Sequence, residues 1–221
     1  MENIPVDGGA VVAMNHISYI DYLPAGLASR QRRRRIRYLL KAEALEHGAV
    51  DFIIKHTDGI PVDRSAGAGA FAESVRRLRA GQLVGVFPEA TISRSFELKE
   101  FKTGAVRMAL EAQVPIVPMI LWGAQRMWTK DHPKDMGRKK IPWVIRAGEP
   151  LPPRGTMAEL DAELRASMTT ILHEVQEQYP HPADAWWVPH RLGGGAPTPA
   201  EAKLLDDAER ADRSRRAAER H

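Results

Sequence analysis

Residues 10–21 read AVVAMNHISYID, and this stretch sets the expectation for the rest of the chain. The run 10–14 is continuously apolar, which is typical of a parallel strand buried on both faces. Polar residues follow at once, among them His16 and Asp21. In α/β proteins, chemistry is carried at the ends of such strands. The stretch therefore predicts a buried strand that leads into a functional turn and then into a helix.

His16 is the candidate general base, because an imidazole gains and loses a proton near neutral pH. Asp21 is too far along the chain to share one face of a continuous helix with it. A turn at His16 would let the carboxylate fold back onto the imidazole, fix its tautomer and stabilise the imidazolium, as the acid does in Ser-His-Asp systems. Taken alone, the pair is more typical of an ordinary turn with a helix-capping aspartate, and only the other blocks of the chain favour the catalytic interpretation.

Composition narrows the classes of protein. The length of 221 residues fits one globular domain. A content of 43% hydrophobic and 27% charged residues excludes a wholly disordered chain. It has no cysteine, so disulfide scaffolds, thiolate metal sites and cysteine nucleophiles are excluded. A net charge of +4 favours an anionic partner. No apolar run approaches the roughly 20 residues that cross a bilayer, and no signal pattern is present. The chain begins almost directly on its first predicted strand, which leaves room for an anchor upstream of it.

Strands and helices alternate along the rest of the chain. Further apolar runs predict strands at 36–41, 83–87, 114–121 and 143–147, the third an edge or irregular strand because of its two prolines. Helices are expected at 22–29, 42–46, 70–80 and 104–113, the last capped by Thr103, and capping boxes at Thr156 and Thr198 begin two more. The pattern predicts an α/β fold with a mostly parallel central sheet flanked by helices.

Four polar-rich blocks, at 16–21, 59–64, 87–95 and 114–119, fall at strand ends or edges, so a common cleft is expected. In the second block, Arg64 is either a phosphate-binding fork or a surface ion-pair former. The run of basic residues at 30–35 is either a solvated face or a contact with anionic lipid headgroups. A nucleic-acid contact would require interleaved aromatics or a recognition helix, and neither is evident.

Together the blocks resemble the glycerolipid acyltransferase family, the bacterial 1-acylglycerol-3-phosphate acyltransferases and their relatives. That family carries an NHxxxxD block, matched by Asn15, His16 and Asp21, and a GxIPVDR-like block, matched loosely by residues 59–64. It also carries an FPEGTRS block, matched in part over residues 87–93, and a VPIVP block, matched by residues 114–118. Order and spacing agree over roughly residues 10 to 150.

The resemblance implies an acyltransferase-like fold, with an acyltransferase domain at 1–180 and a charged, partly helical C-terminal extension at 181–221. It implies an O-acyltransferase that moves a fatty acyl group from acyl-CoA, or acyl carrier protein, to the free hydroxyl of 1-acylglycerol-3-phosphate and gives phosphatidic acid in phospholipid synthesis. The enzyme would work peripherally at the cytoplasmic face of the membrane, on an anionic surface, without a metal, a cofactor or nucleic acid. His16 would be the base and Asp21 its orienting partner. The expected substrate-binding residues are Asn15, Ser18, Gly59, Arg64, Glu89, Thr91, Ser93, Arg94 and Lys102.

The third block departs from the family pattern. Ala90 and Ile92 stand where the family has Gly and Arg around the threonine, so Arg94 or Lys102 would have to replace the expected phosphate-binding arginine. An acceptor with a substituted headgroup, a lysophospholipid or a glycolipid, is therefore an alternative. A non-enzymatic alternative is a protein that binds anionic lipid or nucleic acid through the basic run. With no cysteine and no serine-elbow motif, direct attack by the acceptor hydroxyl is more economical than a covalent acyl-enzyme.

Overall fold

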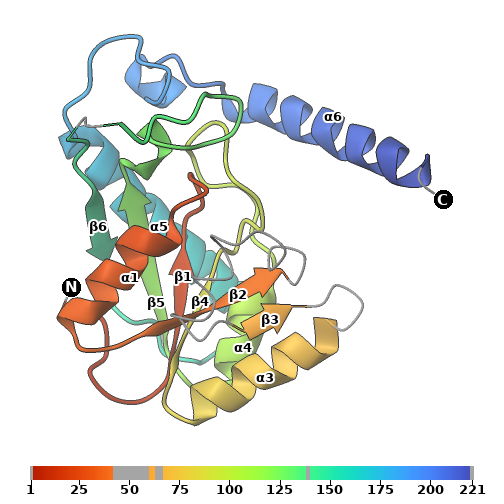
Figure 1. Ribbon diagram of the computed structural model, residues 1–221. Helices are drawn as coiled ribbons and strands as arrows, with labels where there is room; N and C mark the ends of the chain where they lie inside the picture. The colour runs from red at the N-terminus through yellow and green to blue at the C-terminus, as the bar shows by residue number, and fades with distance from the viewer. Residues whose placement is uncertain (1, 42–59, 63–66, 138–139, 220–221) are drawn as a thin grey trace.

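A six-stranded sheet organises the chain, in the order β3-β2-β4-β1-β5-β6. The computed structural model describes residues 2–41, 60–62, 67–137 and 140–219 (Figure 1). All neighbouring strands run parallel except β6, which is antiparallel to β5. The strands are β1 (Ala10–Met14), β2 (Ile36–Lys41), β3 (Ile60–Val62), β4 (Leu83–Val86), β5 (Ile116–Trp122) and β6 (Val144–Ala147). The predicted α/β class and mostly parallel sheet are confirmed.

The first strand lies inside the sheet, as its continuous apolar sequence predicts. Every residue of β1 is buried, and Val11 pairs with Val84 of β4 on one side and Ile116 of β5 on the other. Successive side chains of a strand point to opposite faces, so β1 supplies two cores. Val11 and Ala13 belong to one hydrophobic cluster, and Val12 and Met14 belong to the other.

Helices cover both faces of the sheet (Figure 1). The larger cluster contains buried side chains of α3, α4 and α5, and the smaller one contains Ala25 of α1. The helices are α1 (Tyr22–Gln31), α3 (Gly67–Arg79), α4 (Gly104–Ala112), α5 (Met157–Gln178) and α6 (Pro199–Ala218), with short 3-10 turns at η3 (Ala124–Arg126) and η4 (His190–Leu192). None of the helices within the described ranges is long and apolar enough to span a bilayer.

Two local predictions were wrong. The strand predicted at 114–121 is not an edge strand, because β5, which begins after Pro115 and contains Pro118, lies between β1 and β6. Pro118 has no N–H to donate, and its carbonyl accepts from Gly148 N at 2.8 Å. Gly148 lies one residue beyond the end of β6, so the missing N–H of Pro118 falls where the hydrogen-bonded ladder between the two strands ends. Thr103 precedes α4, but its side chain makes no capping hydrogen bond, since its backbone already has the right-handed helical conformation.

The two predicted capping boxes are present. At α5, Thr156 and Glu159 exchange hydrogen bonds, and at α6 the Thr198 hydroxyl accepts from Glu201 N while Thr198 N donates to the Glu201 carboxylate. The helix α6 then continues to Ala218. Earlier residues of the predicted extension 181–221, including Trp187, pack in the larger core. The boundary at 180 stays a prediction, and the predicted helix at 42–46 lies outside the described residues.

Candidate active site

The turn after β1 is anchored to the end of β5. The Asn15 amide donates from Nδ2 to the Leu121 carbonyl at 3.0 Å, and its Oδ1 accepts from Leu121 N at 2.7 Å. Asn15 is buried, and these two bonds occupy its side chain. The two hydrogen bonds of this amide extend the hydrogen-bonded ladder between β1 and β5 by one position. Asn15 therefore fixes where the turn leaves the sheet, and the predicted contact with substrate is not what its side chain makes here.

His16 and Asp21 meet as the sequence predicted. His16 Nδ1 lies 2.9 Å from Asp21 Oδ2, and the same oxygen accepts from Ile17 N at 2.7 Å and Ser18 N at 2.8 Å. An ionised carboxylate can only accept, so Nδ1 carries the hydrogen and Nε2 presents its lone pair. No group of the described residues hydrogen-bonds Nε2, and the His16 side chain is 21% exposed. The imidazole is thus aligned on one side and open on the other.

The Asp21 carboxylate is shielded from solvent. Its side chain is fully buried, and Oδ1 has no hydrogen-bond partner among the described residues. Burial raises the pKa of the Asp21 carboxyl above its usual range, while the hydrogen bond from His16 acts in the opposite direction. Because only one oxygen of the buried Asp21 carboxylate is hydrogen-bonded, a positive charge beside it would stabilise it. Asp21 therefore favours the protonated, cationic form of His16 during a reaction in which His16 takes up a proton.

Residues that follow β4 support the imidazole from a second side. The His16 ring stacks on the Phe87 ring, with centroids 4.3 Å apart. The Glu89 carboxylate accepts from His16 N at 2.8 Å through Oε1 and from Lys99 N at 3.0 Å through Oε2. Glu89 is buried, which raises the pKa of its carboxyl to about 7. Glu89 therefore ties residues 16–21, which we call the catalytic turn after the role predicted for His16, to its own loop; its predicted contact with substrate stays a prediction.

The polar side chains of the third block are engaged within the protein. Lys99 Nζ donates to Thr91 Oγ1 at 2.6 Å. Ser93 N donates to the His16 carbonyl at 2.8 Å, and Ser93 Oγ donates to the Glu97 carbonyl at 2.7 Å. The structure therefore binds Ser93 directly to the catalytic turn, whereas Thr91 contacts the side chain of Lys99.

The two basic residues predicted to replace the family arginine have different surroundings. The guanidinium of Arg94 is almost completely buried and pairs with Asp131 and, on α6, with Asp206 and Glu209. Lys102 has an exposed side chain, and its backbone N–H donates to the Pro88 carbonyl at 2.8 Å. Of the two residues, Arg94 is thus the one that is buried and ion-paired within the protein. Gly59 and Arg64 lie outside the described residues.

The segment after β5, which no sequence block marked, closes over the catalytic turn. Ser18 Oγ donates to the Trp128 carbonyl at 2.6 Å, and Tyr19 N donates to the same carbonyl at 3.1 Å. Thr129 Oγ1 donates to the Ile17 carbonyl at 2.7 Å. Ser18 is buried and holds the turn in place through these contacts, and its predicted contact with substrate stays a prediction. No sequence motif marks Trp128 or Thr129 as a neighbour of the turn; Trp128 is predicted only as a core residue or an interfacial anchor.

Comparison with known proteins assigns this arrangement to a family. A family model described as "Acyltransferase" matches residues 1–122, which include His16, Asp21 and the whole third block. The chain belongs to the acyltransferase family. It is 30% identical over 176 residues to the 1-acyl-sn-glycerol-3-phosphate acyltransferase of Bacillus subtilis, a match that covers 78% of this chain and 82% of the relative.

Two further comparisons agree with this assignment. The 1-acyl-sn-glycerol-3-phosphate acyltransferase of Borreliella burgdorferi is 26% identical over 141 residues, covering 59% of this chain and 52% of that relative, so the match spans about half of its length. The crystal structure of the 1-acyl-sn-glycerophosphate acyltransferase PlsC from Thermotoga maritima superposes with a TM-score of 0.67 at 23% identity, covering 81% of this chain and 71% of that one. The structural likeness confirms the predicted acyltransferase-like fold.

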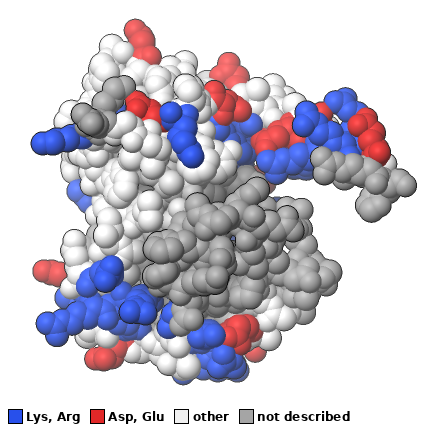
Figure 2. Space-filling view, viewed as in Figure 1, with Lys and Arg blue, Asp and Glu red and all other residues white. Residues whose placement is uncertain are grey.

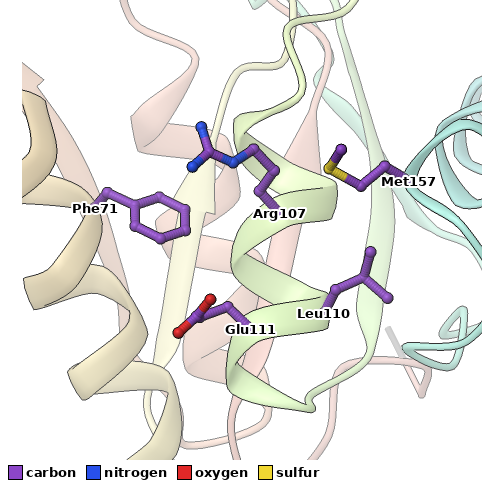
Figure 3. A pocket seen from close by; sticks show the side chains of 5 residues that line it. All are labelled: Phe71, Arg107, Leu110, Glu111 and Met157. Atoms are coloured by element: carbon purple, nitrogen blue, oxygen red, sulfur yellow. The ribbon is translucent and has the colours of Figure 1, made fainter.

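The acyltransferase also has a surface groove away from these residues. It measures about 290 Å³ and is lined by Phe71 of α3, Met157 of α5, and three residues of α4, Arg107, Leu110 and Glu111 (Figure 3). The Arg107 guanidinium lies over the Phe71 ring, 4.9 Å from its centroid. None of the residues that line this groove comes from the four blocks, so we do not include it in the active site.

Proposed function

We propose that this acyltransferase moves a fatty acyl group from acyl-CoA to the free hydroxyl of 1-acylglycerol-3-phosphate and releases phosphatidic acid. The observation that carries the proposal is the 2.9 Å contact between His16 Nδ1 and Asp21 Oδ2, which leaves Nε2 as an aligned base. The names of the relatives from Bacillus subtilis and Borreliella burgdorferi support the choice of acceptor. The names of these relatives specify no donor, and we propose acyl-CoA in that role.

The reaction follows from the open nitrogen of His16. Nε2 removes the proton of the acceptor hydroxyl, and the resulting oxygen attacks the thioester carbonyl. The new C–O bond gives a tetrahedral intermediate, whose collapse breaks the C–S bond. The thiolate leaves with the proton that His16 had taken, and Asp21 stabilises the imidazolium in between. One ester and one free thiol are formed, and the enzyme returns to its starting state.

A covalent acyl-enzyme is disfavoured by the residues around His16. The chain has no cysteine. The buried hydroxyls of Ser18 and Ser93 donate to backbone carbonyls at 2.6 and 2.7 Å, and neither makes the hydrogen bond to an imidazole that activates a serine nucleophile. Direct attack by the acceptor, as the sequence suggested, therefore remains the simplest route.

The test is acyl transfer from radiolabelled acyl-CoA to a panel of acceptors, with the products separated by chromatography. We expect phosphatidic acid from 1-acylglycerol-3-phosphate, and a loss of roughly 10³-fold or more in His16→Ala with the circular dichroism spectrum unchanged. His190→Ala is the matched control, because His190 is exposed on η4. Transfer to lysophospholipids with larger headgroups in preference to 1-acylglycerol-3-phosphate would favour the alternative acceptor. Full activity in folded His16→Ala would contradict the mechanism.

We also propose that α1 faces an anionic membrane surface. Leu23 and Leu27 are 39% and 57% exposed and lie one helical turn apart. Three exposed arginines follow, Arg30, Arg33 and Arg35, and Figure 2 shows basic side chains gathered at the lower left, where α1 leads into β2. An apolar stripe beside cationic residues suits the boundary between lipid headgroups and acyl chains. Each basic residue near such a surface contributes about 1 kcal/mol.

This orientation is tested by sedimentation with lipid vesicles. Leu27→Asp should weaken binding to phosphatidylglycerol vesicles severalfold, while Met157→Asp, also an exposed apolar position, should not. Binding should fall with added salt and should be weak on phosphatidylcholine vesicles. Equal binding of the two variants would assign membrane contact to another surface.

A further inference from the structure

Three cationic side chains gather beside the catalytic turn. Arg94 and Lys99 come from the third block and the residues after it, and Lys130 comes from the segment after β5. The side chains are 8%, 26% and 10% exposed, respectively. We call these three residues the cation cluster. Bringing three positive charges together at this degree of burial is unfavourable unless anions neutralise them.

Two carboxylates of α6 supply most of that neutralisation. Asp206 contacts every member of the cation cluster, through Arg94 Nη1, Lys99 Nζ and Lys130 Nζ. Glu209, less than one helical turn further on, accepts from Arg94 Nη2 and from Lys130 Nζ, both at 2.9 Å. Both acids therefore point from one face of α6 into the same cluster.

The charges match those of a phosphate monoester. The cation cluster and its remaining neighbour Asp131 leave a net charge of +2, and Asp206 and Glu209 contribute −2. A phosphate monoester carries about −1.5 to −2 at neutral pH and presents several acceptor oxygens. Arginine and lysine are the residues that bind such groups. In this structure, the two acids of α6 take the positions that phosphate oxygens would occupy.

The cation cluster adjoins the residues that carry the reaction. Arg94 follows Ser93, whose N–H donates to the His16 carbonyl at 2.8 Å. Tyr19 belongs to the catalytic turn. Burial raises the pKa of its hydroxyl, and the negative charges of Glu209 and Asp131 nearby raise that pKa further. A phosphate on the cluster would therefore belong to a molecule that also reaches His16.

The helix α6 is held by these ion pairs more than by apolar packing. Ala202 is its one buried residue among the described part of the helix, and Leu204 and Leu205 are 71% and 46% exposed. Figure 1 shows α6 extending away from the rest of the chain, and Figure 2 shows acidic and basic side chains side by side along it. Cations buried to this degree can lose the two acids of α6 only if another anion replaces them, so a phosphate that binds the cation cluster would compete directly with α6.

We propose that α6 occupies the acceptor-phosphate site of this enzyme, so that the phosphate of the lipid acceptor binds the cation cluster only after Asp206 and Glu209 have left it. The inference rests on the proposed function and deepens it, because it names the phosphate-binding residues and their intramolecular competitor. Occupation by α6 lowers the apparent affinity for the acceptor in proportion to the fraction of molecules in which the site is filled.

The first experiment compares Asp206→Asn/Glu209→Gln with Asp207→Asn/Asp212→Asn. The control acids lie on the same helix, and their ion pairs are to neighbours on α6. Calorimetry measures the binding of sn-glycerol 3-phosphate and of inorganic phosphate, and kinetics give KM for 1-acylglycerol-3-phosphate. We expect the first variant to bind both phosphates, and the lipid, about tenfold more tightly or more, and the control to match the unmodified protein. Unchanged affinities in the first variant would overturn the inference.

The second experiment follows the helix directly. Because the chain has no cysteine, spin labels can be placed at Leu204→Cys and Met136→Cys, both exposed positions. Saturating 1-acylglycerol-3-phosphate should lengthen the distance between the labels, and inorganic phosphate should do so at higher concentration if the phosphate group alone is recognised. An unchanged distance under saturation would overturn the inference. Tighter phosphate binding in the first variant without acyl transfer to any acceptor would uphold the inference on α6 and refute the proposed function.

Discussion

Asp21→Asn separates the two roles assigned to this carboxylate, which are alignment and charge. In the structure, one oxygen, Oδ2, accepts all three N–H groups, from His16, Ile17 and Ser18, and Oδ1 accepts none. An asparagine can keep its amide oxygen at the Oδ2 position and place its NH2 group at the unpartnered position. In the opposite orientation, the asparagine NH2 group would face the three N–H donors that now bind Oδ2, and none of them would have an acceptor. Asp21→Asn should therefore preserve the imidazole tautomer and remove only the negative charge.

The size of the effect follows from this geometry. A hydrogen bond to a charged group contributes about 1.5–3 kcal/mol, and one between neutral groups about 0.5–1.5 kcal/mol, so loss of the charge costs roughly 1–2 kcal/mol in the transition state. This corresponds to roughly a 5- to 30-fold fall in kcat/KM. Asp21→Ala removes alignment as well, and should cost about 10⁴-fold, as loss of the aspartate does in Ser-His-Asp enzymes. The buried NH2 group of asparagine should lower the free energy of unfolding by about 1–3 kcal/mol.

The assay is the rate of acyl transfer to 1-acylglycerol-3-phosphate, with urea unfolding of each variant measured in parallel. Asp7→Asn, at an exposed position, is the control for the substitution itself. Equal losses in Asp21→Asn and Asp21→Ala would refute the argument, because they would show that charge alone matters and that alignment by Oδ2 does not. A folded Asp21→Ala protein within tenfold of the unmodified rate would refute any role for the pair.

Three further predictions concern the supports of the site. The pKa of the Glu89 carboxyl is about 7 in the folded protein, above its usual value near 4.5, so the stability that this group contributes is present below pH 4.5 and is lost as the pH rises to 7. Urea titrations should show that the unfolding free energy of the unmodified protein, compared with that of Glu89→Gln, falls by about 3 kcal/mol over that range. Asn15→Ala leaves the backbone N–H and C=O of Leu121 unpaired, and should lower the unfolding free energy by about 2–4 kcal/mol and reduce kcat. Gly85→Ala would place a Cβ 2.5 Å from Ile36 Cγ2, so it should destabilise the sheet by about 1–3 kcal/mol in thermal unfolding.

The sequence was sufficient to predict most of the sheet and the contact between His16 and Asp21, because both depend on local pattern; the three-residue strand β3 was not predicted as a strand. A continuous apolar run predicts a strand buried on both faces, and β1 lies where that pattern requires, between β4 and β5. The contact of His16 with Asp21 joins residues of one turn, so spacing alone made it plausible. The interior position of β5 was missed because an edge strand is the usual place for proline, and the local end of β6 beside Pro118 cannot be read from composition.

The remaining features depend on contacts between segments far apart in sequence. Asn15 binds Leu121, 106 residues away, and Arg94 binds Asp206, 112 residues away. Motif matching gives each residue the role of its block, and it therefore assigned Asn15, Ser18, Glu89 and Arg94 to the substrate. In the structure, the first three fix the position of the catalytic turn, and the fourth is paired with two acids of α6, a helix of the predicted charged C-terminal extension.

The hydrogen bonds of the catalytic turn also limit where the oxyanion of the tetrahedral intermediate can be stabilised. Every backbone N–H from residue 16 to residue 21 already donates: to Glu89, twice to Asp21, to the Trp128 carbonyl, and to the hydroxyl and carbonyl oxygens of Ser18. Amides that are committed in this way are not free to receive a developing negative charge. The donors must therefore come from a neighbouring segment. The loop after Glu89 is the first to test, since Ser93 N joins it to the His16 carbonyl at 2.8 Å.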